Sequence, residues 1–267
     1  MSFSLLFLLN IHPAISFLIV SIVCVAIALL GLLIVRKYYH KTHLKENHEV
    51  ASVIFNAFGL IYAVLVAFVV FTAWNSYDAA ERYVEMEVNK ISSLFLDAEA
   101  FDEPMQTQIR VALTEYTRAV VEEEWPIIAS GGRIGRKAQE AQRKIFSAYS
   151  NIDVRKIKNI YLYQESLHQL NAMSEYRRLR LFSSRSSTPF EIWLVLIVGG
   201  TMSVLYTYFF GTKHFKAQCV MTAAYTVMMS ISLYLIYIFS HPFVGYGAVS
   251  NEPFNTMLQV FLRRLGS

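Results

Sequence analysis

Val50–Trp74 reads VASVIFNAFGLIYAVLVAFVVFTAW and contains no charged side chain. A helix rises about 1.5 Å per residue, so this run is long enough to cross the roughly 30 Å hydrocarbon core of a bilayer. Three further uncharged runs of similar length are Ile15–Val35, Ile192–Phe210 and Val220–Phe239. The four runs predict an all-α integral membrane protein with four transmembrane helices.

The composition agrees with this reading. The chain of 267 residues is 55% apolar and only 16% charged, whereas soluble domains are about 25% charged. A net charge of +4 gives no nucleic-acid signature. Cys24 and Cys219 both lie in or beside apolar runs and do not have the spacing of a metal site. No nucleophile motif or phosphate-binding loop is visible, so we expect neither an enzyme nor a metal or other cofactor.

The sequence divides into three parts: residues 1–74 with the first two spans, a polar helical insert at 75–188, and residues 189–267 with the last two spans and a C-terminal segment. Pro104 is expected to interrupt the helix that continues from the second span. The next helix is expected to end in the acidic run Glu122–Glu124 on a solvated surface, because charge runs usually lie there. Asp153 is predicted to cap a long helix that leads toward the third span.

The sequence leaves the sidedness of the insert open. Basic residues between Arg36 and Lys45 favour a cytoplasmic loop after the first span, which would place the insert outside. The arginines between Arg177 and Arg185 favour an insert on the cytoplasmic side instead.

Polar and small residues within the spans are candidates for a functional surface. Asn56 is the first of these, because a polar side chain inside a span is costly and usually faces protein or water. Spans three and four carry similar faces, with Gly199, Ser203, Thr207 and Gly211 on one, and Thr222, Thr226, Ser230, Tyr234 and Tyr237 on the other. Such faces serve either helix packing within one subunit or a water-filled path between subunits. The pore or gate candidates are Asn56, Gly59, Tyr62, Ala63, Val66, Val69 and Phe71.

Charged residues flank the second and third spans. Helical spacing places Asp78, Glu81 and Glu85 on one face and turns Glu87 away from it. Arg177, Arg180 and Arg185 precede the third span, and we expect carboxylates and guanidiniums to pair there. The pairs are either a structural clamp or a charged vestibule or gate.

A resemblance rests on several segments in order: Ala57–Leu65, Tyr77–Ala80, Glu85 with Glu87, and Arg177 with Arg180. The C-terminal segment adds a signature of His241, Pro242, Gly245, Glu252 and Pro253. Together these resemble the bestrophin-like domain family of bacterial integral membrane proteins. The resemblance implies a multi-pass protein of the bacterial plasma (inner) membrane, similar to bestrophins, which are pentameric anion channels. The bestrophin pore-neck motif is not found in this sequence, so no ion selectivity is implied.

Two functions from different classes follow. The first is an oligomeric membrane ion channel, or a channel-like protein, whose second span lines the pore. Its partners would be the lipid bilayer, further copies of the chain and small inorganic ions. The alternative is a non-conducting membrane scaffold or sensor whose helical insert binds a protein partner.

Overall fold

The structure is a computed structural model that describes residues 7–38, 48–132, 135–153, 155, 157, 159–209 and 214–266. Every longer regular element in these residues is helical. The chain forms two compact units. The membrane unit consists of Met1–Ser76 and Ser187–Ser240, and the insert unit consists of Tyr77–Ser186 and His241–Ser267. The predicted segment 189–267 is therefore divided between the two units.

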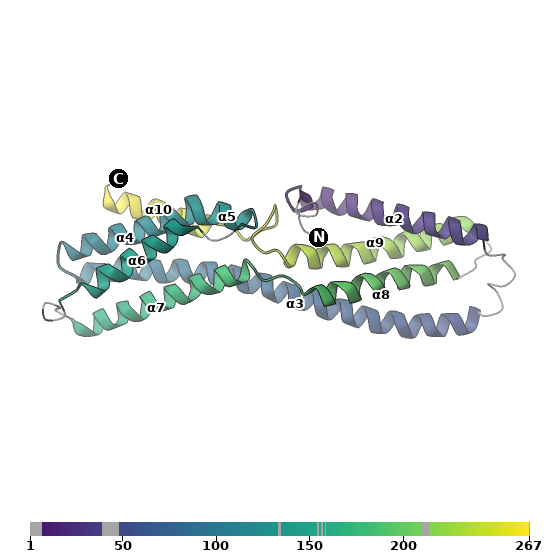
Figure 1. Ribbon diagram of the computed structural model, residues 1–267, viewed down its shortest axis with the longest axis horizontal. Coiled ribbons are helices and arrows are strands. Elements are labelled where there is room, and N and C mark those ends of the chain that lie inside the picture. Colours follow the sequence, from purple (N-terminus) through teal and green to yellow (C-terminus); the bar gives the residue numbers. More distant parts are fainter. Residues whose placement is uncertain are drawn as a thin grey trace. The chain divides into compact units, whose positions relative to one another are not determined.

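The membrane unit contains α2 (Pro13–Tyr38), the first part of α3 (His48–Asp97), α8 (Phe190–Phe209) and α9 (Phe215–Phe239) (Figure 1). These are the four helices that are long and apolar enough to cross a membrane. The predicted fold class is thus confirmed, and the four spans imply a lipid bilayer around this unit. The helix of the second span continues past Trp74, as expected, and α3 runs unbroken to Asp97.

Close packing in the membrane unit depends on small residues opposite a tyrosine. Tyr62 on α3 donates a hydrogen bond to the backbone oxygen of Leu196 on α8, at 2.6 Å. A β-carbon at Gly199 would overlap the Tyr62 ring, so glycine there lets the two helices approach. Val66 and Val69 continue the same buried face of α3, in a cluster that also contains Ile236 of α9.

The insert unit contains the rest of α3 and the remaining helices. They are the 3₁₀ turn η1 (Ala98–Ala100), α4 (Met105–Ala119), the π-helical turn η2 (Val120–Glu124), α5 (Trp125–Ala129), α6 (Arg136–Ser150), α7 (Ile160–Ser183) and α10 (Glu252–Leu265). Its core is one cluster of buried apolar side chains drawn from all of the longer helices. The C-terminal helix belongs to this core, since Phe261 stacks on Phe95 at 3.9 Å between ring centroids.

The start of α7 differs from the prediction. The helix begins at Ile160, and the Asn159 side chain accepts hydrogen bonds from the backbone N–H groups of Tyr161 and Leu162, at 3.1 and 3.2 Å. Asn159 is therefore the N-cap, and the assignment of that role to Asp153 was wrong. Asp153 instead forms an exposed ion pair with Arg155, at 3.3 Å.

Candidate functional site

A network of buried charges lies at the centre of the insert unit. Arg180 on α7 contacts Glu87 on α3 through Nε at 2.7 Å, and Glu124 at the end of η2 through Nη2, also at 2.7 Å. Arg177, one turn earlier on α7, donates to the second oxygen of Glu124 at 2.5 Å. The side chains of Glu87, Glu124 and Arg180 are fully buried, and that of Arg177 is nearly so. Two positive and two negative charges are thus removed from water together.

Hydrogen bonds with two neutral side chains complete the network. The Tyr116 hydroxyl on α4 donates to Glu87 at 2.5 Å, and Arg177 donates to the Gln142 side chain on α6 at 3.0 Å. Burial and the Glu87 carboxylate raise the pKa of Tyr116 well above its usual range, so Tyr116 remains a donor. Burial alone would lower the pKa of Arg180, but Glu87 and Glu124 outweigh it and raise that pKa. Tyr116 therefore stays neutral and Arg180 stays positively charged.

Aromatic rings cover the Arg180 guanidinium. Its central carbon lies 5.7 Å from the ring centroid of Trp125 and 5.4 Å from that of Phe254, within the range of cation–π attraction. Trp125 also packs edge-on against Phe243. The rings come from α5, α10 and the segment before α10, so the network joins most of the unit.

The C-terminal signature forms the turn that leads to this aromatic cover. Pro242 is buried, and its carbonyl accepts a hydrogen bond from Val249 N–H at 2.7 Å. Gly245 has φ 90°, which favours glycine. Glu252 and Pro253 open α10, and His241 begins the segment. The five residues therefore shape the chain that carries Phe243 and Phe254.

Of the predicted charged residues, Glu87, Arg177 and Arg180 form the network. Asp78 pairs with Arg82 on its own helix at 2.7 Å, with both side chains exposed to solvent. Glu81, Glu85 and Arg185 are exposed. The expected pairing of carboxylates with the α7 arginines therefore holds for Glu87, the carboxylate that helical spacing turned away from the other three.

Glu124 was missed as a member of the network. It was expected on a solvated surface with Glu122 and Glu123, but its side chain is fully buried. The sequence does contain a signal: Tyr116, Val120 and Glu124 follow one another at four-residue spacing on the buried stripe of α4 and η2. A carboxylate on an apolar stripe needs a buried cation, and two arginines of α7 supply it.

The pore candidates divide between two faces of α3 in the membrane unit. Tyr62, Val66 and Val69 are buried against α8 and α9. Asn56, Ala63 and Phe71 are exposed, and Gly59 is half-buried with open space where a β-carbon would be. The exposed set keeps a polar amide and small residues on an otherwise apolar surface.

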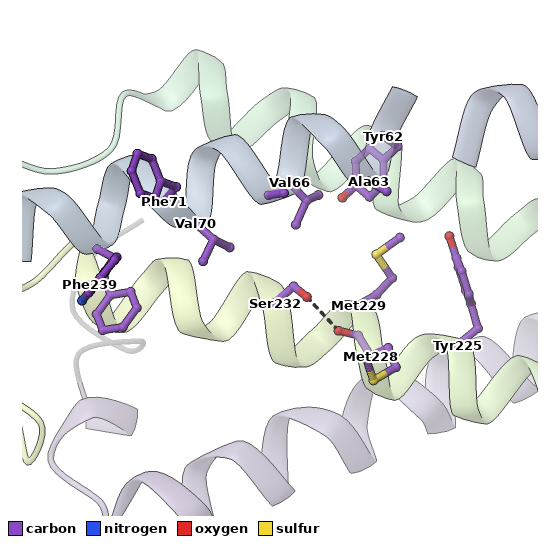
Figure 2. Close-up of a pocket in the computed structure, with 12 residues that line it drawn as sticks. Tyr62, Ala63, Val66, Val70, Phe71, Tyr225, Met228, Met229, Ser232 and Phe239 are labelled. Atoms are coloured by element: carbon purple, nitrogen blue, oxygen red, sulfur yellow. Dashed lines mark hydrogen bonds between the residues drawn. The ribbon is translucent and has the colours of Figure 1, made fainter. Parts of the chain in front are cut away.

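A groove lies between α3 and α9 in the same unit, with a volume of about 630 Å³. Figure 2 shows Ala63, Val66 and Phe71 of α3 on one wall, and Met228 and Met229 among the residues of α9 on the other. Its Ser232 hydroxyl donates to the backbone oxygen of Met228, at 3.1 Å (Figure 2). The groove surface is therefore mostly apolar.

The hydroxyl-bearing faces of α8 and α9 are used inside the membrane unit. Ser230 bonds Ser21 of α2 at 3.0 Å, and Thr207 bonds Thr222 at 3.2 Å. The Thr226 hydroxyl donates to the backbone oxygen of Thr222 at 2.8 Å. This geometry is the one expected if these faces serve helix packing within a subunit, rather than a water-filled path between subunits. Gly211, Lys41 and Lys45 lie outside the described residues.

Comparisons with known proteins bear on the family and the fold of this chain. The Bestrophin-like domain model matches residues 22–254. A crystal structure of a mutant bacterial bestrophin homolog from Klebsiella pneumoniae superposes with a TM-score of 0.72 at 11% identity, covering 94% of this chain and 99% of that one.

A second mutant of a bacterial bestrophin homolog from Klebsiella pneumoniae gives a TM-score of 0.68 at 13% identity, with the same coverage. A structure described as a membrane protein gives 0.72 at 11%, again covering 94% and 99%. No match was found among curated protein sequences. At such low identity these structures share the fold with this chain, whereas the domain match extends over most of its length. The chain therefore belongs to the Bestrophin-like domain family.

Proposed function

We propose that the chain is one subunit of an oligomeric ion channel, with the exposed face of α3 lining the ion path. The observation that carries the proposal is the position of Asn56. Its amide is exposed on a span whose neighbouring exposed residues, among them Val53 and Leu60, are apolar. A polar side chain facing lipid is costly, so Asn56 calls for a polar surrounding, and the described residues of one subunit leave its amide exposed.

The polar faces of the other spans support the assignment of the path to α3. Several hydroxyl groups of α2, α8 and α9 pair with one another or with backbone oxygens, so helix packing accounts for them. The Asn56 amide of α3 is instead turned outward, and Thr201 of α8 is also exposed. Along the same helix, Ala63 and Phe71 are exposed and follow the same side as Asn56. A small residue leaves room for a path, and an apolar ring can form a constriction that empties of water when closed.

The buried charge network supports the proposal because it fixes the orientation of α3. The network itself is not part of the path. Glu87 is held by Arg180, and Glu85, two residues earlier on α3, is exposed. The carboxylates of Glu81 and Glu85 are thereby held outward on a helix whose rotation is fixed. We propose that these two carboxylates attract cations and repel anions at one mouth of the path.

The test is ion flux from purified protein in liposomes. We expect flux from the wild-type chain and a severalfold change in flux from Asn56→Leu, because the amide would be replaced by a larger apolar group. Thr72→Val is the matched control, since Thr72 is exposed on another side of α3 and its hydroxyl already donates to Phe68 O at 2.9 Å.

Absence of flux under every ion gradient and voltage would overturn the channel proposal. Recovery of a stoichiometric protein partner by such a non-conducting chain would then support the scaffold or sensor function. A monomeric particle in detergent without a conduit would also count against the channel.

A further inference from the structure

Basic side chains gather at one end of the membrane unit, where α2 ends and α9 begins. Arg36 and Lys37 lie in the last turn of α2, and Lys216 lies in the first turn of α9. The two helices pack side by side (Figure 1), and the central carbon of the Arg36 guanidinium lies 4.7 Å from the ring centroid of Phe215. The three bases therefore lie at the same end of this pair of helices.

This end of the unit lies at a boundary of the membrane. Both α2 and α9 are long and apolar enough to span a bilayer, and the three bases lie in the terminal turns of these spans. Tyr38, the last residue of α2, is 77% exposed, and tyrosine is enriched where the apolar core of a bilayer meets the lipid headgroups. The bases are therefore expected at the depth of the lipid phosphate groups.

The charge of the membrane unit is uneven. Among the side chains that the structure describes, its lysines and arginines are the three at this end, and its acid is Glu191 in the first turn of α8. Glu191 lies at the opposite end, because it is the last turn of α8 that accepts a hydrogen bond from Gln218 near the start of α9. The sequence next to the basic end adds three bases and two acids, which are Lys41, Lys45, Lys213, Glu46 and Glu49. The excess charge at this end is therefore positive.

The two lysines are placed to bind an anion from outside the chain. Lys37 and Lys216 are exposed, and within the described part of the chain neither forms an ion pair. The first turn of a helix favours a negative charge, yet the described first turn of α9 contains Lys216 and no acidic residue. Arg36 is half-buried over Phe215, so its planar group is held beside the same turn. Ammonium and guanidinium groups together are the donors that proteins use for phosphate.

We propose that Arg36, Lys37 and Lys216 bind the phosphate group of an anionic membrane lipid. Basic residues beside a membrane attract anionic lipids, whereas a zwitterionic lipid carries its own compensating ammonium. The apolar residues that precede these bases on α2, Leu33 and Ile34, are 50% and 58% exposed and would contact the acyl chains. A dissolved phosphate offers the same charge but no chains for this surface, so the lipid is the favoured occupant.

Native mass spectrometry of the purified full-length chain in detergent tests the proposal. The probes are phosphatidylglycerol, which is anionic, and phosphatidylcholine, which is zwitterionic, with identical acyl chains. We expect phosphatidylglycerol to bind at least tenfold more tightly. Each basic charge near an anionic membrane surface strengthens binding by about fivefold. Lys37→Gln combined with Lys216→Gln should therefore weaken phosphatidylglycerol binding at least tenfold and leave phosphatidylcholine binding unchanged.

Arg143→Gln combined with Arg178→Gln is the matched control. Both arginines are exposed in the insert unit, and their replacement changes the net charge by the same amount. This control should keep the phosphatidylglycerol affinity within twofold of wild type. Inorganic phosphate at millimolar concentration should not displace the bound lipid, because it lacks the acyl chains.

Four results would overturn the site. They are equal affinity for the two lipids, wild-type affinity in the lysine double variant, an equal loss in the arginine control, and displacement by inorganic phosphate, which would assign the bases to a dissolved anion. Because Lys37 and Lys216 are exposed, their double variant is expected to fold even if Arg36→Gln does not. Lipid binding is measured without ion flux, so the result stands or falls separately from the channel proposal.

Discussion

The two parts of α3 follow opposite rules for which side chains face outward. In the membrane unit the outward residues include Ile61 and Phe68, which are 70% and 69% exposed. In the insert unit the helix buries Val84 and Ile91 and turns Glu81 and Glu85 outward. The difference follows from the surroundings, lipid for one part and water for the other. One continuous helix thus changes its pattern at about Ser76 without a break in its hydrogen bonds.

The two units also bury different kinds of polar groups. The membrane unit contains pairs of neutral hydroxyls such as Ser21 with Ser230. The insert unit contains full charges, Glu87 and Glu124 with Arg177 and Arg180. A neutral pair in which one hydroxyl also bonds its own backbone, as Ser230 does, loses little when one member is removed, whereas an unpaired buried charge is costly. Substitutions in the two units should therefore differ strongly in cost.

The largest effect is expected from Arg180→Ala in the insert unit. Glu87 and Glu124 would both be left buried with fewer partners, which costs about 3–5 kcal/mol of stability. The measurement is thermal or denaturant unfolding of the purified protein in detergent. Arg82→Ala is the control, because its pair with Asp78 is exposed and such pairs contribute at most about 1 kcal/mol. Equal stability of the two variants would show that the network is not a clamp.

Tyr116→Phe should have the next largest effect. It removes the hydroxyl that donates to Glu87 while keeping the ring, and hydrogen bonds to charged groups contribute roughly 1.5–3 kcal/mol. Tyr161→Phe on α7 is a matched control, since Tyr161 is 79% exposed. If both variants unfold at the same midpoint in the same assay, Glu87 does not depend on this donor.

In the membrane unit, Gly199→Ala should be the most damaging of the small changes. The added methyl group would overlap the Tyr62 ring, and overpacking costs about 1–3 kcal/mol. Gly59→Ala is the control on the neighbouring span. Its β-carbon would meet no atom, and alanine in a helix is favoured over glycine by up to about 1 kcal/mol. Unfolding in detergent micelles distinguishes them, and a loss in Gly59→Ala equal to that in Gly199→Ala would contradict this packing.

Ser230→Ala is expected to have the smallest effect. Hydrogen bonds between transmembrane helices average about 0.6 kcal/mol, and the Ser230 hydroxyl also bonds its own backbone at 2.9 Å. The unfolding midpoint should fall by only a degree or two. A loss as large as that of Tyr116→Phe would mean that the two units do not differ in the way proposed.

The spans were predictable because each requirement of a membrane helix is local: length, lack of charge and apolar surface. The pairing of Glu87 was partly predictable as well, since helical spacing turns it away from Asp78, Glu81 and Glu85. Glu124 was not recognised because its neighbours Glu122 and Glu123 suggested a solvated run. Which of Tyr62, Val66 and Ala63 faces α8 depends on contacts between distant segments, and an apolar run does not specify them.

Thiol modification along α3 tests directly whether its exposed face lines an ion path. In a chain with Cys24 and Cys219 replaced, Ala63→Cys would place a thiol on the proposed path, and Ile61→Cys would place one on the opposite, exposed side of the helix. We expect a charged, water-soluble thiol reagent to change ion flux through Ala63→Cys in liposomes and to leave flux through Ile61→Cys unaltered. Unchanged flux through a fully modified Ala63→Cys chain, or the same change in both variants, would contradict it.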